Sequence, residues 1–154
     1  MRQLLHPIAT LFAALLALAP VAVLAQDIQI TADNFVVNET TREAVFTGNV
    51  IIVHPSVTLR APKVTVIYGA GGTSDVQSFE ADGPVDLTTA EQQAKGDRAV
   101  FDPKAQMLYL TGNVTVINAG GTLTGPELVV DIANNTSKFT GGTGGRVTGV
   151  FTSP

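Results

Sequence analysis

The chain has 154 residues, enough for one domain and hardly for two. Nine Lys and Arg against thirteen Asp and Glu give a net charge of −4, which argues against non-specific nucleic-acid binding because that requires a basic surface. There is no Cys, so neither a disulfide framework nor thiolate chemistry is available. Fifteen Gly and only 14% charged residues indicate short strands and turns rather than helices.

Residues 1–25 have the features of a secretory signal peptide. Arg2 supplies a positive charge, an apolar run covers residues 8–19, and Val23-Leu24-Ala25 suits cleavage after Ala25. The apolar run is shorter than the ~20 residues that a membrane-spanning helix needs, although it continues weakly to Leu24. The sequence therefore predicts a cleaved signal peptide and an exported domain of residues 26–154. An uncleaved membrane anchor is the alternative.

Beyond residue 25 the apolar residues follow a two-residue period, and no useful stretch has the 3.6-residue spacing of a helix. Alternation is clear over residues 28–33, 43–53 and 79–87, as in half-buried strands. Pro62 predicts a corner or an edge of a sheet rather than a central ladder position, because it has no N–H to donate. We expect an all-β domain of a dozen or more short antiparallel strands.

The strand pattern is duplicated at an interval of 64 residues. Residues 32–68 lie over 96–132 without a gap, with ten identities in 37 positions. The shared run Thr47-Gly48-Asn49-Val50 recurs as Thr111-Gly112-Asn113-Val114, and Gly83-Pro84-Val85 stands in the same place of a half-length variant. A glycine between inward apolar residues lets a long strand bend while it keeps its register, so these runs predict bends.

Both copies place apolar residues in one strand register and polar residues in the other. The apolar register includes Phe46 and Val64 in the first copy and their counterparts Leu110 and Leu128 in the second. Side chains of a strand alternate between faces, so we expect this register to point inward and the other to be solvated. Residue types alone favour a dry β-sandwich core. With only six Phe and two Tyr after residue 25, an incompletely filled interior is the alternative.

Residues with catalytic potential are few after residue 25. His54 is the one histidine there and precedes a proline in a turn, so neither a metal site with nitrogen or sulfur ligands nor a Ser-His-Asp set is indicated. Paired carboxylates for glycan hydrolysis are available among Asp33, Asp97, Asp102 and Asp131. Their places at turns or on the outward register favour Asx-type hydrogen bonds instead. The sequence predicts no enzymatic activity, no metal and no cofactor.

Three runs of the repeated unit form a recognisable pattern: Ile28-x-Ile30-x-Ala32-Asp33, the Thr-Gly-Asn-Val bend, and the return Leu59-x-Ala61-Pro62-x-Val64. The second copy fits the same pattern from Gly96 onward. In these runs the unit resembles the LptA/OstA family of lipopolysaccharide-transport proteins. The terminal pair Arg146-Val147 resembles the last strand of that family. Pro62 and Pro126 depart from the family pattern, which often has Asp there.

The resemblance implies a curved antiparallel sheet folded over on itself and open at its ends. It also implies that the inward apolar face holds the acyl chains of lipid A during transport through the periplasm, from an LptC-like inner-membrane protein to an LptD-like outer-membrane translocon. Protomers and partners join edge to edge, so a head-to-tail homo-oligomer is implied as well. Burial of acyl chains contributes about 0.8 kcal/mol per CH₂, which suits a carrier without covalent chemistry.

Under this resemblance, the residues expected to contact acyl chains are Ile28, Ile30, Phe35, Val37, Phe46, Val50, Ile52, Leu59, Val64, Val66, Phe79, Val85, Leu87, Phe101, Leu108, Leu110, Val114, Val116, Leu123, Leu128 and Val130. Three alternatives stay open at this point. The chain is a membrane-anchored LptC-like relative if its N-terminal segment is not cleaved. It is a structural β-solenoid if its core is dry, or a glycan hydrolase if two of the turn aspartates act together.

Overall fold

The computed structural model describes residues 28–153, and the predicted signal segment lies outside that range. The described chain forms one antiparallel sheet and one short 3-10 helix, η1. The elements are β1 (Gln29–Thr31), β2 (Asn34–Asn38), β3 (Glu43–His54), β4 (Val57–Tyr68), η1 (Gly72–Ser74), β5 (Val76–Thr88), β6 (Gln92–Asp102), β7 (Met107–Asn118), β8 (Gly121–Asp131), β9 (Thr136–Thr140) and β10 (Thr148–Phe151). Over residues 28–153, no helix has the length and apolar character to cross a membrane.

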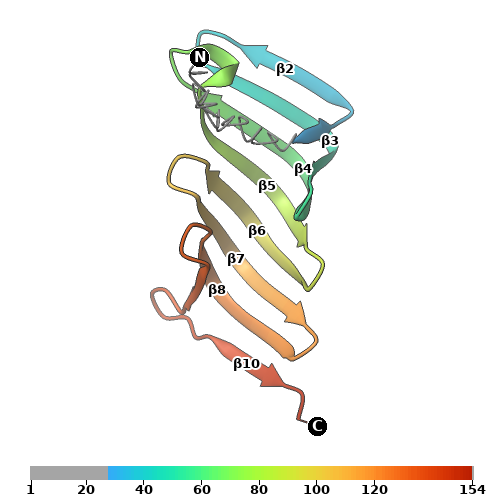
Figure 1. The fold of residues 1–154 in the computed structure, drawn as a ribbon, viewed down its shortest axis with the longest axis vertical. Coiled ribbons are helices and arrows are strands. Elements are labelled where there is room, and N and C mark those ends of the chain that lie inside the picture. Colours follow the sequence, from blue (N-terminus) through green and yellow to red (C-terminus); the bar gives the residue numbers. More distant parts are fainter. Residues whose placement is uncertain (1–27, 154) are drawn as a thin grey trace, which may run out of the picture.

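The strands follow one another across the sheet in chain order (Figure 1). At one edge β1 and β2 both pair with β3, and at the other edge β9 and β10 both pair with β8. Each edge therefore consists of two short strands that pair with the same long strand. The two edges do not pair with each other within the described residues, and the sheet stays open. The predicted all-β, open-ended fold is confirmed.

The number of strands differs from the prediction, which was a dozen or more short ones. The sheet has ten strands, and the six from β3 to β8 are each 11 to 13 residues long. At the Gly-Asn runs the chain bends, as predicted, and then continues in the same ladder, so each bend lies inside one long strand.

The bends of the six long strands line up across the sheet and form a crease. The pairing register shifts there between every two neighbouring strands. Between β3 and β4, for example, Gly48 and Asn49 stand opposite Pro62 alone, as in a β-bulge. The crease comprises Gly48, Asn49, Pro62, Gly83, Pro84, Asp97, Gly112, Asn113 and Pro126.

The backbone at the crease explains the repeated Gly-Asn pair. Gly48 and Asn49 have φ of 80° and 46°, and Gly112 and Asn113 have 78° and 48°. Asparagine enters this left-handed region more readily than most residues that carry a Cβ. Pro62 lies in β4, a central strand, so the predicted edge position is wrong and the predicted corner is confirmed. At a bulge its missing N–H removes no ladder bond.

The sheet covers its own inner face, since the described chain has no second layer. Val50, Val64, Val85, Leu110 and Val114 are at most 2% exposed, and they form one cluster although they come from both sides of the crease. The sheet is therefore folded along the crease into two facing walls. The predicted inward register is confirmed by this cluster, and the opposite register is solvated.

Candidate functional site

Cross-strand pairing defines the apolar surface of the two walls. One wall consists of the part of β3 that precedes the crease and of the strand segments that continue its pairing across the sheet. It carries most of the aromatic residues, and we call it the aromatic wall. Its row near the crease consists of Phe35, Phe46, Val64, Ala81, Ala99, Leu110, Leu128 and Phe139. Its row near the rim consists of Val37, Ala44, Val66, Phe79, Phe101, Leu108 and Val130.

The facing wall is purely aliphatic along its main row, and we call it the aliphatic wall. This row consists of Ile30, Ile52, Leu59, Leu87, Ala94, Val116, Leu123 and Gly149. Both walls run uninterrupted from one edge of the sheet to the other. The space between them is therefore an apolar trough that is open at both ends.

The trough is packed at the crease and looser at its rims. Leu110 and Val64 are fully buried, and Leu110 packs so closely on β6 that a Cβ on Gly96 would lie 2.8 Å from its Cδ1. Phe79 and Phe101, near the rim, are only half-buried. Close packing of this kind gives the fold its stability, whereas the rim residues are free to contact other molecules.

A hollow of about 300 Å³ lies between the walls at the amino-terminal end of the trough. We call it the amino-terminal hollow. It is lined by Ile28, Ile30, Phe35, Ala44, Phe46, Val66, Tyr68, Thr73, Val76 and Phe79. Thr73 and the hydroxyl group of Tyr68 are the polar groups of a lining that is otherwise apolar, and the volume is at the lower end of the range of about 300–1,000 Å³ for ligand pockets.

Aromatic pairs shape this end of the trough. The rings of Phe35 and Phe46 lie 4.6 Å apart between centroids and are tilted by 33°. Those of Phe79 and Phe101 lie 6.2 Å apart and are tilted by 31°. Both separations are in the range of favourable aromatic contacts.

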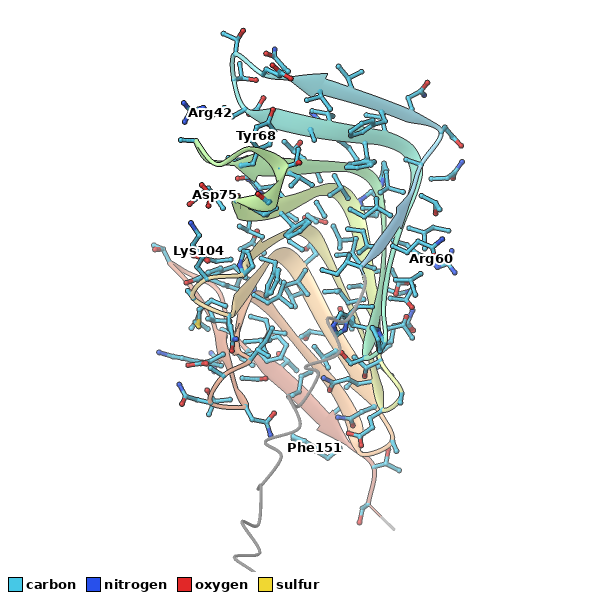
Figure 2. The ribbon with its side chains drawn as sticks, turned by 45° about the horizontal axis from the view of Figure 1, so that its top comes forward. Arg42, Arg60, Tyr68, Asp75, Lys104 and Phe151 are labelled. Carbon is cyan, nitrogen blue, oxygen red and sulfur yellow. The ribbon has the colours of Figure 1, made fainter. Side chains whose placement is uncertain are left out.

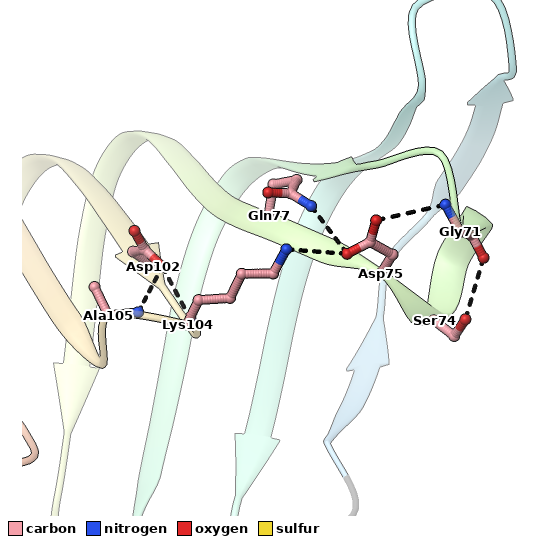
Figure 3. Close-up of polar contacts among 7 residues, drawn as sticks. All are labelled: Gly71, Ser74, Asp75, Gln77, Asp102, Lys104 and Ala105. Carbon is pink, nitrogen blue, oxygen red and sulfur yellow. Dashed lines mark hydrogen bonds and ion pairs between the residues drawn. The ribbon is translucent and has the colours of Figure 1, made fainter.

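The loop of residues 69–75, which we call the strap, reaches the rim of the hollow through Thr73. The Asp75 carboxylate holds the strap (Figure 3): it accepts hydrogen bonds from Gly71 N at 3.4 Å, Gln77 Nε2 at 2.9 Å and Lys104 Nζ at 3.0 Å. The hydrogen bond from Lys104 is the main reason that the pKa of Asp75 lies below its ordinary value of 3.8. Figure 2 shows Asp75 and Lys104 on the same side of the sheet.

A second hollow, of about 430 Å³, lies at the crease beside β3, β4 and β5. Its lining includes Asn49, Ile51, Arg60 and Asp86, which belong to the outward register. Figure 2 shows Arg60 on the opposite side of the ribbon from Asp75. This hollow is larger, but its charged lining suits water better than apolar chains, so the amino-terminal hollow is the better candidate site.

The carboxylates that were candidates for catalysis are used in turns and in the crease. Asp102 Oδ1 accepts the backbone N–H groups of the following turn at 2.9 Å, and Asp131 Oδ1 does the same at 3.0 Å. Asp33 and Asp97 accept hydrogen bonds from the side chains of Asn49 and Asn113, at 3.2 and 2.9 Å. The predicted turn role is confirmed for the first pair. The second pair braces the crease, which the sequence pattern did not indicate.

The predicted lipid-contact residues all lie in the inward register or at the mouth of the trough, but their exposure differs. Buried among them are Val50, Val64, Val66, Val85, Leu87, Leu110, Val114, Val116 and Leu128. Half-buried are Ile30, Phe46, Ile52, Leu59, Phe79, Phe101, Leu108, Leu123 and Val130. Exposed are Ile28, Phe35 and Val37. Thr73 and Val76 line the hollow but carried no sequence signal, because they belong to the irregular loop and its junction with β5.

Fold and site together define a folded-over β-sheet with an apolar interior open at both ends. The chain is similar at the level of fold to LptH from Pseudomonas aeruginosa, described as the LptA homologous periplasmic component of the conserved lipopolysaccharide transport device. The TM-score is 0.72 at 20% identity, over 83% of this chain and 96% of that chain.

Sequence comparison gives the family. Residues 29–136 match the family described as LptA/(LptD N-terminal domain) LPS transport protein. An uncharacterised protein of Rhizobium meliloti (strain 1021) is 35% identical over 101 residues, which are 62% of this chain and 54% of that protein, so the chain spans about half the length of this relative. The chain belongs to the LptA/(LptD N-terminal domain) LPS transport family, a family of transport proteins, and the resemblance seen in the sequence is confirmed.

Proposed function

We propose that this protein is a periplasmic carrier and bridge component that holds the acyl chains of lipopolysaccharide in the trough between its walls. The observation that carries the proposal is the amino-terminal hollow, an apolar space between two walls in a chain of a lipopolysaccharide-transport family. Each CH₂ transferred from water into such a space contributes about 0.8 kcal/mol. A trough of this kind retains a lipid by contact area and needs no directed bond.

The burial pattern supports a division of roles along the proposed contact surface. Exposed and half-buried residues such as Phe35, Phe46 and Phe79 border the hollow and meet the acyl chains first. Fully packed residues such as Val64 and Leu110 hold the two walls together at the crease. Acyl chains contact this second group only as the walls part.

A photo-crosslinking amino acid at Phe35 tests the proposal, with Val36 as the matched control. The two positions are neighbours in β2 and are similarly exposed, at 56% and 63%, but they belong to opposite registers. We expect lipopolysaccharide to be captured from position 35 and not from position 36. Equal capture at both positions, or no capture at position 35 in a folded protein, would contradict the proposal and favour a structural module with a dry core.

We further propose that the split edges of the sheet dock partners of the transport system and second copies of the chain. Unpaired backbone groups at a sheet edge readily accept another strand. In the repeat, β2 corresponds to part of β6, and β4 corresponds to β8. Since β9 pairs with β8 as β5 pairs with β4, β9 is the counterpart of part of β5. Since β5 and β6 pair through Ala81 and Ala99, the equivalent pair between two copies is Phe139 of one and Phe35 of the next. The rows of both walls then continue from copy to copy.

Cysteine cross-linking tests this register in a chain that has no native Cys. The pairing places Lys138 of one copy opposite Val36 of the next. We expect a mixture of Lys138→Cys and Val36→Cys chains to form disulfide-linked dimers on oxidation. As the control, Lys138→Cys chains are mixed with Val45→Cys chains. Val45 lies opposite Val36 but in β3, inside the sheet, so the proposed pairing does not place it opposite Lys138. Equal yields with both partners would contradict the proposed register.

The place of action follows from the predicted export signal, and we propose that the mature protein works in the periplasm. N-terminal sequencing of the exported protein tests this. A start at Gln26 is expected. A mature protein that retains Met1 or Arg2 and sediments with the inner membrane would instead indicate an anchored, LptC-like role.

A further inference from the structure

The amino-terminal hollow has its two polar side-chain groups in one short segment of the chain. They are the hydroxyl groups of Tyr68, the last residue of β4, and of Thr73, in the strap that follows directly after β4. Every other side chain of the lining is a hydrocarbon. The hydroxyl groups therefore lie where β4 ends and the strap meets the rim, and the rest of the hollow is apolar.

Tyr68 is held in place by the backbone around it. Its N–H donates to the carbonyl oxygen of Arg42 at 3.1 Å, and the N–H of Gly69 donates to the carbonyl oxygen of Asp75 at 2.8 Å. Figure 2 shows Arg42, Tyr68 and Asp75 along the same margin of the sheet.

The hydroxyl group of Tyr68 has no hydrogen-bond partner among residues 28–153, although the residue is only 7% exposed and a buried tyrosine hydroxyl usually has one. Within the same range, no fully enclosed side-chain polar atom lacks a partner. The Tyr68 oxygen is therefore not enclosed by protein. It meets accessible space at a residue that lines the hollow, so it is free to bond a ligand.

Thr73 supplies the second hydroxyl group without a partner in the described chain. The hydroxyl of its neighbour Ser74 donates to the carbonyl oxygen of Gly71 at 3.2 Å, as short hydroxyl side chains in turns commonly do. Thr73 makes no such bond to the strap and borders the hollow instead. The ion pair of Asp75 with Lys104, at 3.0 Å, anchors the strap that carries Thr73 (Figure 3).

We propose that the hydroxyl groups of Tyr68 and Thr73 bind the carbonyl oxygen of an acyl chain and so fix the direction in which the chain lies in the hollow. This inference rests on the proposed function, that the trough holds acyl chains. An acyl chain has a hydrogen-bond acceptor at its carbonyl end and none along its tail. With the carbonyl at the rim, the tail lies against the apolar remainder of the lining. The reverse direction leaves both hydroxyl groups against hydrocarbon, which is unfavourable for polar groups withdrawn from water.

The test uses the purified protein and two uncharged amphiphiles, 1-decanoylglycerol and 1-O-decylglycerol, below their aggregation concentrations. The two have the same head group and alkyl chain length, but only the first has a carbonyl group. Dissociation constants are measured by isothermal titration calorimetry. We expect Tyr68→Phe, which removes one oxygen and keeps the ring, to weaken binding of 1-decanoylglycerol about two- to tenfold and to leave binding of 1-O-decylglycerol unchanged. Thr73→Val should have the same selective effect.

The matched control is Tyr109→Phe, since Tyr109 is the other tyrosine of the chain and lies in β7 opposite Val100, in the outward register. It should change neither dissociation constant. Circular dichroism establishes that each variant is folded.

The outcomes separate the two proposals. Equal weakening of both amphiphiles by Tyr68→Phe, or unchanged binding of 1-decanoylglycerol in both Tyr68→Phe and Thr73→Val, overturns the carbonyl contact while lipid binding stands. A selective loss in one variant alone supports the contact and assigns it to that hydroxyl group. Absence of binding of either amphiphile to the wild type contradicts the proposed function itself.

Discussion

The crease gives the sharpest test of how this sequence shapes its sheet. Replacing Gly112 with alanine adds one methyl group at a residue with φ of 78°. That methyl group would lie 2.5 Å from Oδ2 and 2.7 Å from Cβ of Asp97. The substitution therefore acts in two ways, through the backbone conformation and through the contact with Asp97.

The two effects have separate magnitudes. A residue with a Cβ costs about 1–2 kcal/mol more than glycine in the left-handed region. Asp97 must also move away, which breaks its 2.9 Å hydrogen bond from Asn113 Nδ2; such a bond contributes about 0.5–1.5 kcal/mol. We expect Gly112→Ala to lower the free energy of unfolding by about 2–3 kcal/mol in total. Gly142→Ala is the matched control, since its φ is 57° but no atom lies within 4 Å of the added methyl group.

Urea denaturation followed by far-ultraviolet circular dichroism measures both variants, because the chain has no Trp to serve as a fluorescent probe. The control should show the backbone cost alone. In an Asp97→Ala background, Gly112→Ala should cost about 1 kcal/mol less than in the wild type, because the contact with the carboxylate and its hydrogen bond from Asn113 are already absent and only the contact with the Cβ remains. If Gly112→Ala costs no more than the control, or if the background changes nothing, the close approach of Asp97 does not hold the crease.

Three further outcomes are expected. Leu110→Ala should lower the free energy of unfolding by about 2–5 kcal/mol because this residue is fully buried. Leu108→Ala, at a half-buried residue of the same strand, should lower it clearly less, and equal losses in denaturation would refute the distinction between the packed crease and the looser rim. The pKa of Asp75 is lowered chiefly by Lys104, so the pair stabilises the strap above the ordinary value of 3.8, and this stabilisation is lost as pH falls through the folded-state pKa. In an NMR titration of the Asp75 carboxyl carbon, Lys104→Met should raise the midpoint toward 3.8, and an unchanged midpoint would assign the shift to other contacts. Arg98 pairs with Glu80 at 2.9 Å in an exposed position, so Arg98→Met should cost at most about 1 kcal/mol, and a larger loss would reveal a packing role for its side chain.

Local patterns in the sequence carried most of the fold. Two-residue alternation gave the strands and their inward face, and the match at 64 residues gave the duplication that the bounds of β3 and β7 reproduce. The Thr-Gly-Asn-Val runs gave the position of the bend. The alternation and the bends depend on neighbours a few residues apart, and the duplication appears when the sequence is compared with itself, so the sequence alone contains all three.

Features that depend on distant residues were not predictable in the same way. Asp33 lies 16 residues from Asn49, and only the folded sheet shows that the two side chains meet. Pro62 suggested a corner or an edge, and only the pairing of β4 with both of its neighbours shows that it lies at a bulge inside a central strand. The amino-terminal hollow depends on how the two walls lie relative to each other, and no alternation of apolar residues encodes that distance.

The crease has a mechanical consequence. Six strands cross it, and each crosses once, at the same level as its neighbours. Because ladder hydrogen bonds on both sides tie the strands into two stiff plates, a change of angle in one strand is transmitted to the next. All six strands therefore share one angle between the two plates. Under the proposed function, a lipid that spreads the walls at one end would ease the opening at the other, and successive lipids would then not load independently.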